Sequence, residues 1–178
     1  FKKAVVAENL KILADHVFDN ADFQNGGSII FALFAFTIQI YADFSGYSDM
    51  AIGVSKMMGI DLSINFKTPY FSRSISEFWR RWHITLSFWL RDYVFIPLGG
   101  SRAQKWKIYR NLFLVFLLAG IWHGADWTFV IWGAVHGLLV IIERIFGWHK
   151  SPSNTIWNFL RWGFTFAIII LTMLPVRA

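Results

Sequence analysis

The sequence of 178 residues contains no cysteine. This absence excludes a disulfide framework, a metal site built from thiolates and a thiol nucleophile. The Gly-x-Ser-x-Gly pattern of a serine nucleophile elbow is absent as well, so a covalent intermediate on serine has little support. Any reaction in this chain therefore has to use other side chains.

Charge is also scarce. Charged residues make up 16% of the sequence, against about 25% in ordinary soluble domains. Apolar residues reach 56% and aromatic residues 19%, with ten tryptophans and nineteen phenylalanines. A water-soluble core of this size cannot bury so many large side chains, so the composition indicates a membrane protein. The first residue is Phe1 rather than methionine, and we expect the chain to be a piece of a longer protein.

The net charge of +6 raises the question of a nucleic-acid partner. The basic residues lie in short connectors between apolar runs, a distribution typical of the cytoplasmic loops of membrane proteins. Anionic lipid headgroups match such charges better than nucleic acid does. We therefore expect the lipid bilayer, and no nucleic acid, as the partner of these residues.

The apolar periodicity predicts an all-α, polytopic integral membrane protein. In order, we expect an interfacial amphipathic helix over residues 1–22, a membrane helix over 23–42, a polar turn over 41–53 leading into a short helix, a connector over 61–72 and an aromatic helix over 75–95. A basic cytoplasmic loop over 101–110, apolar runs over 111–124, 127–142 and 162–176, and a second cytoplasmic loop over 147–161 complete the prediction. The chain would then have four segments at membrane depth.

The aromatic helix predicted over 75–95 differs from the others. Ser74 and Glu77 form a capping-box pattern at its start. Its ends carry charges that a lipid-facing helix does not tolerate, whereas its aromatic stripe is too apolar for water. A re-entrant or tilted helix, enclosed by other parts of the protein, satisfies both observations.

Two histidines lie among tryptophans in apolar sequence, where an ionisable side chain is costly to bury and is functional by default. His123 stands between Gly120 and Gly124, and two interpretations remain open. The glycines either allow close helix packing or leave room for a substrate beside the imidazole. For His83 taken alone, a polar anchor at the end of an aromatic helix is the simpler interpretation.

Three further residues are secondary candidates. His136 lies between Gly133 and Gly137, a spacing common at helix-packing faces, so we expect packing or hydrogen bonding there. Asp43 and Asp49 lie in a segment rich in serine and tyrosine, where a polar turn is a simpler interpretation than a catalytic pair of carboxylates. No histidine or cysteine accompanies them at ligand spacing, and no metal site is predicted.

A family resemblance is carried by four segments in a fixed order: YADFSGYSDMAIG (41–53), SISEFWRRWHITLSFWLRDYVFIPLGG (74–100), GIWHG (120–124) and FVIWGAVHG (129–137). Together they closely resemble the membrane-bound O-acyltransferase family. The resemblance extends over nearly the whole chain. It is strongest to the bacterial branch that acetylates exported polysaccharides such as alginate.

The resemblance implies that His123 is the catalytic histidine and that His83 is its companion across a reaction chamber. It implies a helical bundle around a tunnel in a bacterial inner membrane. Residues 1–178 would be part of one membrane domain that lacks its early helices and its extreme C-terminus. The implied donor is a cytoplasmic acyl thioester such as acetyl-CoA, with no bound cofactor. The implied partners are an exported polysaccharide acceptor and a periplasmic acetyltransferase.

These expectations give a hypothesis of acyl transfer to a hydroxyl. An imidazole titrates at about pH 6.5 and suits a general base, so His123 would activate the nucleophile while His83 holds the donor carbonyl. The other predicted site residues are tryptophans that shape a water-excluding chamber, and arginines that either attract the donor's phosphates or anchor lipid headgroups: Trp79, Trp82, Trp122, Arg80 and Arg81.

Two other classes of function remain open from the residues themselves. The alternative is a transporter or channel that uses intramembrane histidines as a proton relay. A third possibility is a purely structural membrane subunit, which would tolerate the loss of both histidines. An acyltransferase consumes a thioester, whereas a transporter shows coupled flux without consuming one.

Overall fold

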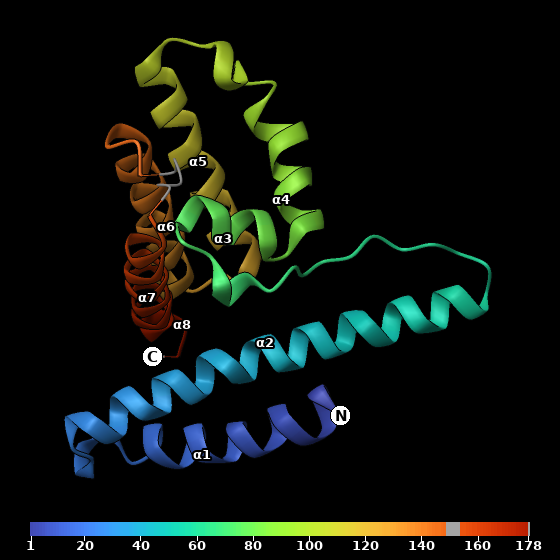
Figure 1. Ribbon diagram of the computed structural model, residues 1–178, viewed down its shortest axis with the longest axis vertical. Helices are drawn as coiled ribbons and strands as arrows, with labels where there is room; N and C mark the ends of the chain where they lie inside the picture. Colours follow the sequence, from blue (N-terminus) through green and yellow to red (C-terminus); the bar gives the residue numbers. More distant parts are fainter. Residues whose placement is uncertain (149–153, 178) are drawn as a thin grey trace. The chain divides into compact units, whose positions relative to one another are not determined.

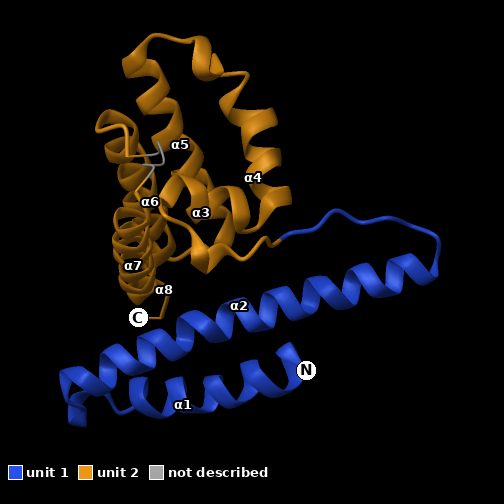
Figure 2. Ribbon diagram, in the orientation of Figure 1, with its two compact units in different colours: residues 1–65 blue, residues 66–178 orange. Residues whose placement is uncertain are grey.

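The structure is a computed structural model that describes residues 1–148 and 154–177. All regular elements in this described part of the chain are helical, and it contains no strand. The chain divides into two compact units, Phe1–Asn65 and Phe66–Ala178, which are coloured separately in Figure 2. Each unit is described by itself below. The expectation of a single membrane domain stays a prediction.

The first unit is a pair of helices joined by a short connection (Figure 1). A wide first turn, η1 (Lys2–Ala7), runs directly into α1 (Glu8–Phe18), and a short 3₁₀ turn, η2 (Ala21–Phe23), follows. The chain then enters α2 (Gly26–Met57), along which α1 packs. Asn25 caps the start of α2 by accepting a hydrogen bond from the Ser28 backbone N–H. The predicted amphipathic helix is present and ends at Phe18, four residues earlier than expected.

The polar turn expected over 41–53 is wrong, because α2 continues through this segment without interruption to Met57. Gly46, within the expected turn, is buried in the middle of the helix. A Cβ atom on Gly46 would lie 2.9 Å from the backbone nitrogen of Lys3. The glycine therefore allows η1 to approach α2 closely and does not bend the chain.

The second unit contains the remaining elements, in the order η3 (Pro69–Phe71), α3 (Ile75–Arg81), α4 (Ile84–Leu90), η4 (Arg91–Phe95), η5 (Gly100–Arg102), α5 (Lys105–His123), α6 (Trp127–Ile145), α7 (Thr155–Thr172) and α8 (Leu174–Arg177). Two predicted loops are shorter than expected. The loop expected over 101–110 is helical from Lys105, and the loop expected over 147–161 is helical from Thr155, with residues 149–153 outside the described chain.

The aromatic helix expected over 75–95 is broken into α3 and α4. The break falls at His83, whose backbone adopts the left-handed conformation with φ 43° and ψ 55°. Nothing in the sequence announces this break, because neither glycine nor proline stands there. The predicted cap is present: Ser74 accepts a hydrogen bond from the Glu77 backbone N–H at 3.0 Å. The Glu77 carboxylate in return accepts from the backbone N–H of Arg73.

Helices α5 and α6 cross at very close range through glycines. A Cβ on Gly120 of α5 would lie 2.3 Å from the carbonyl oxygen of Phe129, and a Cβ on Gly133 of α6 would lie 2.4 Å from the carbonyl oxygen of Phe116. Backbone therefore meets backbone at this crossing. Small residues that permit such an approach are typical of helix packing inside membranes.

Three helices in the described residues are long and apolar enough to cross a membrane: Gly26–Met57, Trp127–Ile145 and Thr155–Arg177. The expectation of four membrane-depth segments therefore holds for three. Helix α5 is not among them, because its first turns carry Lys105, Lys107 and Arg110. The span predicted over 23–42 starts three residues later, at Gly26, and extends beyond the predicted end to Met57.

The glycine crossing makes a testable prediction. Gly120→Ala is expected to destabilise the full-length protein by about 1–3 kcal/mol, the usual cost of overpacking a tight contact. Gly163→Ala in α7 is the matched control, because a Cβ there meets no atom within 4 Å. The measurement is the midpoint of thermal unfolding of both purified variants in detergent. Equal midpoints for Gly120→Ala and the wild type would contradict this account of the crossing.

Candidate active site

Six aromatic side chains of the second unit form a continuous series of ring contacts, here called the ring series. Its members are, in spatial order, His83, Trp122, His123, Trp132, His136 and Trp79. Centroid distances between neighbours run from 4.9 Å between Trp132 and His136 to 6.0 Å between His83 and Trp122. Residues from α3, α5 and α6, and from the α3–α4 break, thus meet in one place. Five of the six were candidates from the sequence, and Trp132 is new.

His83 occupies the break between α3 and α4, and its side chain is half-buried. A left-handed backbone at a residue other than glycine costs about 1–3 kcal/mol and tends to occur at functional sites. His83 and Trp122 line a cavity of about 650 Å³ whose other walls are almost entirely apolar, here called the apolar cavity. The structure therefore places His83 at a helix end, as expected, and also in the lining of a cavity.

His123 is the last residue of α5 and is exposed. Its imidazole contacts Trp122, Trp132 and Phe129. It lies close enough to His83 for a charge on one imidazole to act on the other. These two histidines, predicted as companions, are thus brought together over Trp122.

The glycines that frame His123 serve packing. Gly120 forms the α5–α6 crossing, and a Cβ on Gly124 would lie 2.6 Å from the ring of Phe129. Of the two interpretations left open by the sequence, close packing is the one that describes the glycines. The free space near the histidines comes instead from the apolar cavity beside His83 and from the exposed edge of His123.

His136 of α6 is fully buried. Its Nδ1 accepts a hydrogen bond from Trp79 Nε1 at 3.2 Å, so Nδ1 carries no proton and a neutral ring carries its proton on Nε2. The sequence predicted packing or hydrogen bonding for His136, and the structure shows both: the hydrogen bond from Trp79 and ring contacts with Trp79 and Trp132. Trp79 also packs against Trp132 and Phe116, which fixes α3 against α5 and α6.

The other predicted aromatic residues separate in space. Trp122 is 62% exposed and lies between the two histidines. Trp82 is buried in a cluster with Phe66, Tyr70 and Phe78, and it is not among the side chains that line the described cavities. Trp82 therefore anchors the chain next to the α3–α4 break in the buried core.

A larger cavity of about 930 Å³ lies between α3, α4, α5 and the end of α6, and is here called the basic cavity. Its lining includes four cationic side chains and no carboxylate: Arg80, Arg91, Lys105 and Arg144. Arg91 also pairs with Asp92 at 2.7 Å, and this hydrogen bond raises the pKa of the Arg91 guanidinium. Arg81 does not line the basic cavity and pairs instead with Glu77 at 2.6 Å. The two arginines predicted for the donor thus have different surroundings.

Asp43 and Asp49 belong to the first unit and face the start of the chain. Asp43 pairs with Lys3 at 2.5 Å, and Asp49 pairs with Lys2 at 2.8 Å. The hydrogen bond to Asp49 raises the pKa of the Lys2 amine. Both carboxylates therefore join η1 to α2, a structural role that the sequence did not suggest.

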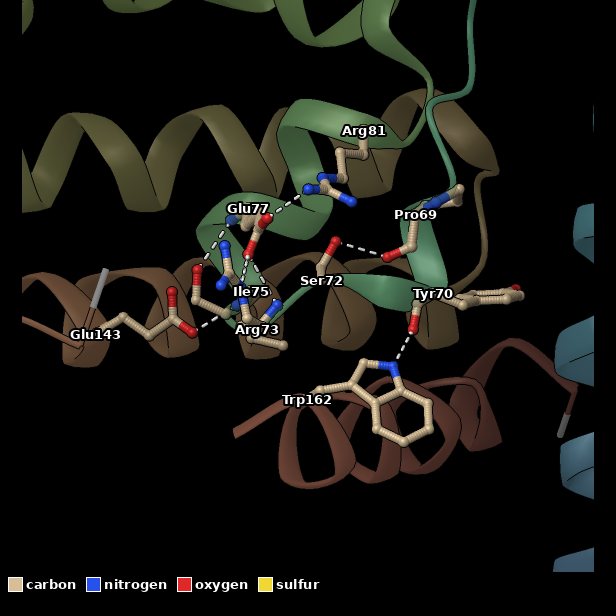
Figure 3. A network of polar contacts seen from close by, with 10 residues as sticks. Pro69, Tyr70, Ser72, Arg73, Ile75, Glu77, Arg81, Glu143 and Trp162 are labelled. Carbon is tan, nitrogen blue, oxygen red and sulfur yellow. Dashed lines mark hydrogen bonds and ion pairs between the residues drawn. The ribbon is translucent and has the colours of Figure 1, made fainter. Parts of the chain in front are cut away.

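One important residue was missed from the sequence. Glu143 of α6 is 9% exposed, and its carboxylate accepts hydrogen bonds from the start of α3, as Figure 3 shows for Ile75. The same figure shows Glu77 between Arg73 and Arg81, and Trp162 of α7 donating to the carbonyl of Tyr70. The available signal was a single carboxylate at the end of an apolar run.

Within residues 1–148 and 154–177, no group of three or more histidine, aspartate or glutamate side chains is arranged to hold a metal ion.

Residues 1–175 match the model of the membrane-bound O-acyltransferase family, MBOAT. The chain belongs to this family. The expected family and the expected all-α, polytopic membrane fold are both confirmed.

Three relatives illustrate the range of the family. A probable alginate O-acetylase AlgI of Pseudomonas putida is 50% identical over 177 residues, which cover 99% of this chain and 36% of that protein. A peptidoglycan O-acetyltransferase of Helicobacter pylori is 45% identical over 179 residues, covering 100% of this chain and 34% of the relative. A teichoic acid D-alanyltransferase of Bacillus subtilis is 36% identical over 156 residues, which cover 81% of this chain and 38% of the relative. The chain spans about a third of the length of these MBOAT relatives.

The ion pairs of the first unit give a second prediction. If Asp43 serves only to hold Lys3, Asp43→Asn and Lys3→Gln are expected to lower stability equally, by less than about 1 kcal/mol. Any acyl transfer by the full-length protein should stay within roughly twofold of the wild type in both variants, because one half-buried ion pair near the surface contributes little. Thermal midpoints and transfer rates are measured side by side. Loss of transfer in Asp43→Asn alone would return Asp43 to the catalytic candidates.

Proposed function

We propose that the protein containing this chain is a membrane-embedded O-acyltransferase. It transfers an acyl group, acetyl in the first instance, from a cytoplasmic thioester to hydroxyls of an exported polysaccharide such as alginate. Family membership supports the reaction class. The observation that carries the site assignment is the meeting of His83 and an exposed His123 over Trp122, beside an apolar cavity.

His123 is the general base in this proposal. The acceptor hydroxyl oxygen attacks the carbonyl carbon of the thioester while the imidazole takes the hydroxyl proton. The carbon–sulfur bond then breaks, and the proton passes to the departing thiolate. The products are an acetyl ester and a free thiol, so no covalent acyl-enzyme is needed. His83, held in its left-handed conformation, donates a hydrogen bond to the carbonyl oxygen as negative charge develops there.

Exclusion of water is the task of the apolar walls. Trp122 and the aliphatic residues of α4 and α5 line the apolar cavity, which would surround the reacting carbonyl. A dry site strengthens the hydrogen bonds to the carbonyl and limits competing hydrolysis of the thioester.

The basic cavity is the proposed entry for the donor. Its volume lies in the range usual for ligand pockets. Four cationic side chains in the lining, of which Arg91 also pairs with Asp92, match the phosphates of acetyl-CoA or of another phosphate-bearing acyl thioester. Anchoring of lipid headgroups is the other use of such charges, and the donor dependence described below distinguishes the two.

The names of the relatives support the class of acceptor, and the family resemblance suggests the location and the partner. Alginate, peptidoglycan and teichoic acid are the polymers in their names, and each is a glycan-containing or polyol polymer outside the cytoplasm. We therefore propose a location in the bacterial inner membrane, an exported polysaccharide as the final acceptor and a periplasmic acetyltransferase as a partner in the transfer.

The ring series gives little support to a proton relay. Trp122 and Trp132 stand between the three histidines, and an indole N–H can donate a hydrogen bond but cannot accept a proton in turn. Transport coupled to these histidines therefore stays an outcome of the test.

The first test compares wild type, His123→Ala and His16→Ala of the full-length protein in membranes. His16 is an exposed histidine of α1 and serves as the matched control. With radiolabelled acetyl-CoA, His123→Ala is expected to lower label transfer to polymer by about 10²- to 10⁴-fold, the usual value of a general base. His16→Ala should transfer at the wild-type rate. Unchanged transfer in His123→Ala would place the base elsewhere, and no thioester use by any variant would favour transport.

The donor cavity is tested by removing charge. Arg80→Gln and Arg144→Gln are each expected to raise KM for acetyl-CoA roughly two- to fivefold with kcat unchanged, which corresponds to about 0.5–1 kcal/mol of screened attraction. Lys11→Gln on α1 removes an equal charge outside the cavity and should leave KM unchanged. The kinetics are measured at low and at high salt, since screening should reduce the difference. Equal KM values for all variants would favour lipid anchoring.

A further inference from the structure

We propose that Glu143 is a positioning residue for His83. It holds the start of α3, and α3 in turn presents the histidine that follows its last turn. This inference rests on the proposed acyltransferase function and adds a residue that neither the sequence motifs nor the ring series contains.

The carboxylate of Glu143 accepts three hydrogen bonds from the first residues of α3. Oε1 accepts from the Ile75 backbone N–H at 2.5 Å, and Oε2 accepts from both the backbone N–H and the hydroxyl of Ser76 at 2.8 Å. Figure 3 shows this carboxylate of α6 reaching across to α3. Backbone N–H groups at a helix start have no partner within the helix, so the carboxylate satisfies groups that would otherwise be left unbonded.

The charge of Glu143 is compensated where it lies. Buried carboxylates are costly unless they are paired and hydrogen-bonded. Besides the hydrogen bonds from α3, the charge of the buried Arg161 on α7 acts on Glu143. Arg161 itself stacks over Trp148. Glu143 therefore lies where α3, α6 and α7 meet, and both of its carboxylate oxygens accept hydrogen bonds.

Helix α3 depends on such outside support. With seven residues it is too short to be stable alone. Its second attachment comes from the same helix α6, where His136 accepts the hydrogen bond from Trp79. One attachment holds the first turn of α3 and the other holds the next turn, so together they fix both the position and the rotation of α3 on α6.

His83 lies just past the C-terminal end of α3, opposite the end that Glu143 contacts. A seven-residue helix is about 10 Å long, so a tilt of about 10° at its start moves its end by nearly 2 Å. A displacement of about 1 Å in a catalytic group can cost roughly 10²-fold in rate. The left-handed backbone of His83 persists only while α3 and α4 are both held. Loss of the Glu143 contacts is therefore expected to misplace the imidazole.

Helix α6 also carries Trp132, whose ring contacts His123. The two proposed reacting histidines come from different elements, yet contacts with α6 help to hold both of them in position. In this arrangement, Glu143 is the residue of α6 that positions His83 through α3.

The first experiment uses the full-length protein in membranes with acetyl-CoA and polymer acceptor. Glu143→Gln keeps the side-chain shape but replaces one acceptor oxygen with an amide NH₂ that faces the N–H donors of α3. We expect kcat to fall about tenfold or more, with KM for acetyl-CoA within roughly twofold of the wild type. Glu8→Gln on the exposed face of α1 is the matched control and should leave both constants unchanged.

A double variant separates positioning from general stability. If Glu143 acts through His83, Glu143→Gln in a His83→Ala background should lower kcat by no more than about twofold further. Losses that multiply in the double variant would overturn the proposal, because they would show that Glu143 acts independently of His83.

A second measurement does not depend on activity. The rate at which diethyl pyrocarbonate modifies His83 is followed by mass spectrometry, with the exposed His16 as internal reference. Glu143→Gln should change the His83 rate about threefold or more and leave the His16 rate unchanged. An unchanged His83 rate would overturn the proposal even if kcat falls. If Glu143→Gln does not accumulate in membranes, Glu143→Asp, which keeps the charge on a shorter side chain, is labelled instead and should change the His83 rate in the same direction.

The outcomes for the two proposals are distinct. If the wild type consumes no acetyl-CoA, the proposed function fails, while the labelling of His83 still decides whether Glu143 positions it. If the wild type is active but Glu143→Gln leaves the His83 labelling rate unchanged, or its loss of kcat multiplies with that of His83→Ala, the function stands and the positioning role is wrong.

Discussion

The contact on which the second unit depends is the glycine crossing of α5 and α6. Gly120 and Gly133 bring two backbones so close that no Cβ atom fits between them. Inside a bilayer, burial of apolar surface gives little drive for helices to associate, so this close packing supplies much of their attraction. The crossing also decides the chemistry of the region, because it places His123 at the end of α5 against Trp132 of α6.

Helix α6 thereby becomes the common support of two histidines that are 40 positions apart in the sequence. On one side it meets His123 through Trp132. On the other it holds the short α3 through Glu143 and His136, and α3 leads directly to His83. An enzyme needs its reacting groups fixed relative to each other rather than relative to the protein as a whole. One rigid helix that carries the supports for both groups meets this requirement.

Much of this could be predicted from the sequence, and the failures share a cause. Helical periodicity, the cap at Ser74 and the small residues at the crossing are local patterns, and they were identified correctly. The turn expected over 41–53 was wrong because Gly46 serves a contact with a distant segment, Lys3, and only the structure reveals that contact. The break at His83 was missed because the aromatic pattern continues through it, while the Glu143 and His136 contacts that hold α3 against α6 come from far along the chain. Long-range contacts, and not local propensity, decided each of these points.

The surroundings of the three histidines of the ring series give the three imidazoles different capacities. His136 is buried, and its Nδ1 is already occupied by Trp79, so it has no free nitrogen lone pair for a substrate proton. His123 is exposed at a helix end. His83 is half-buried beside an apolar cavity, in a backbone conformation that fixes the direction of its side chain. Accessibility therefore favours His123 as the base and confinement favours His83 as the group that holds the carbonyl, a distinction that the glycine-flanked motifs GIWHG and AVHG do not contain.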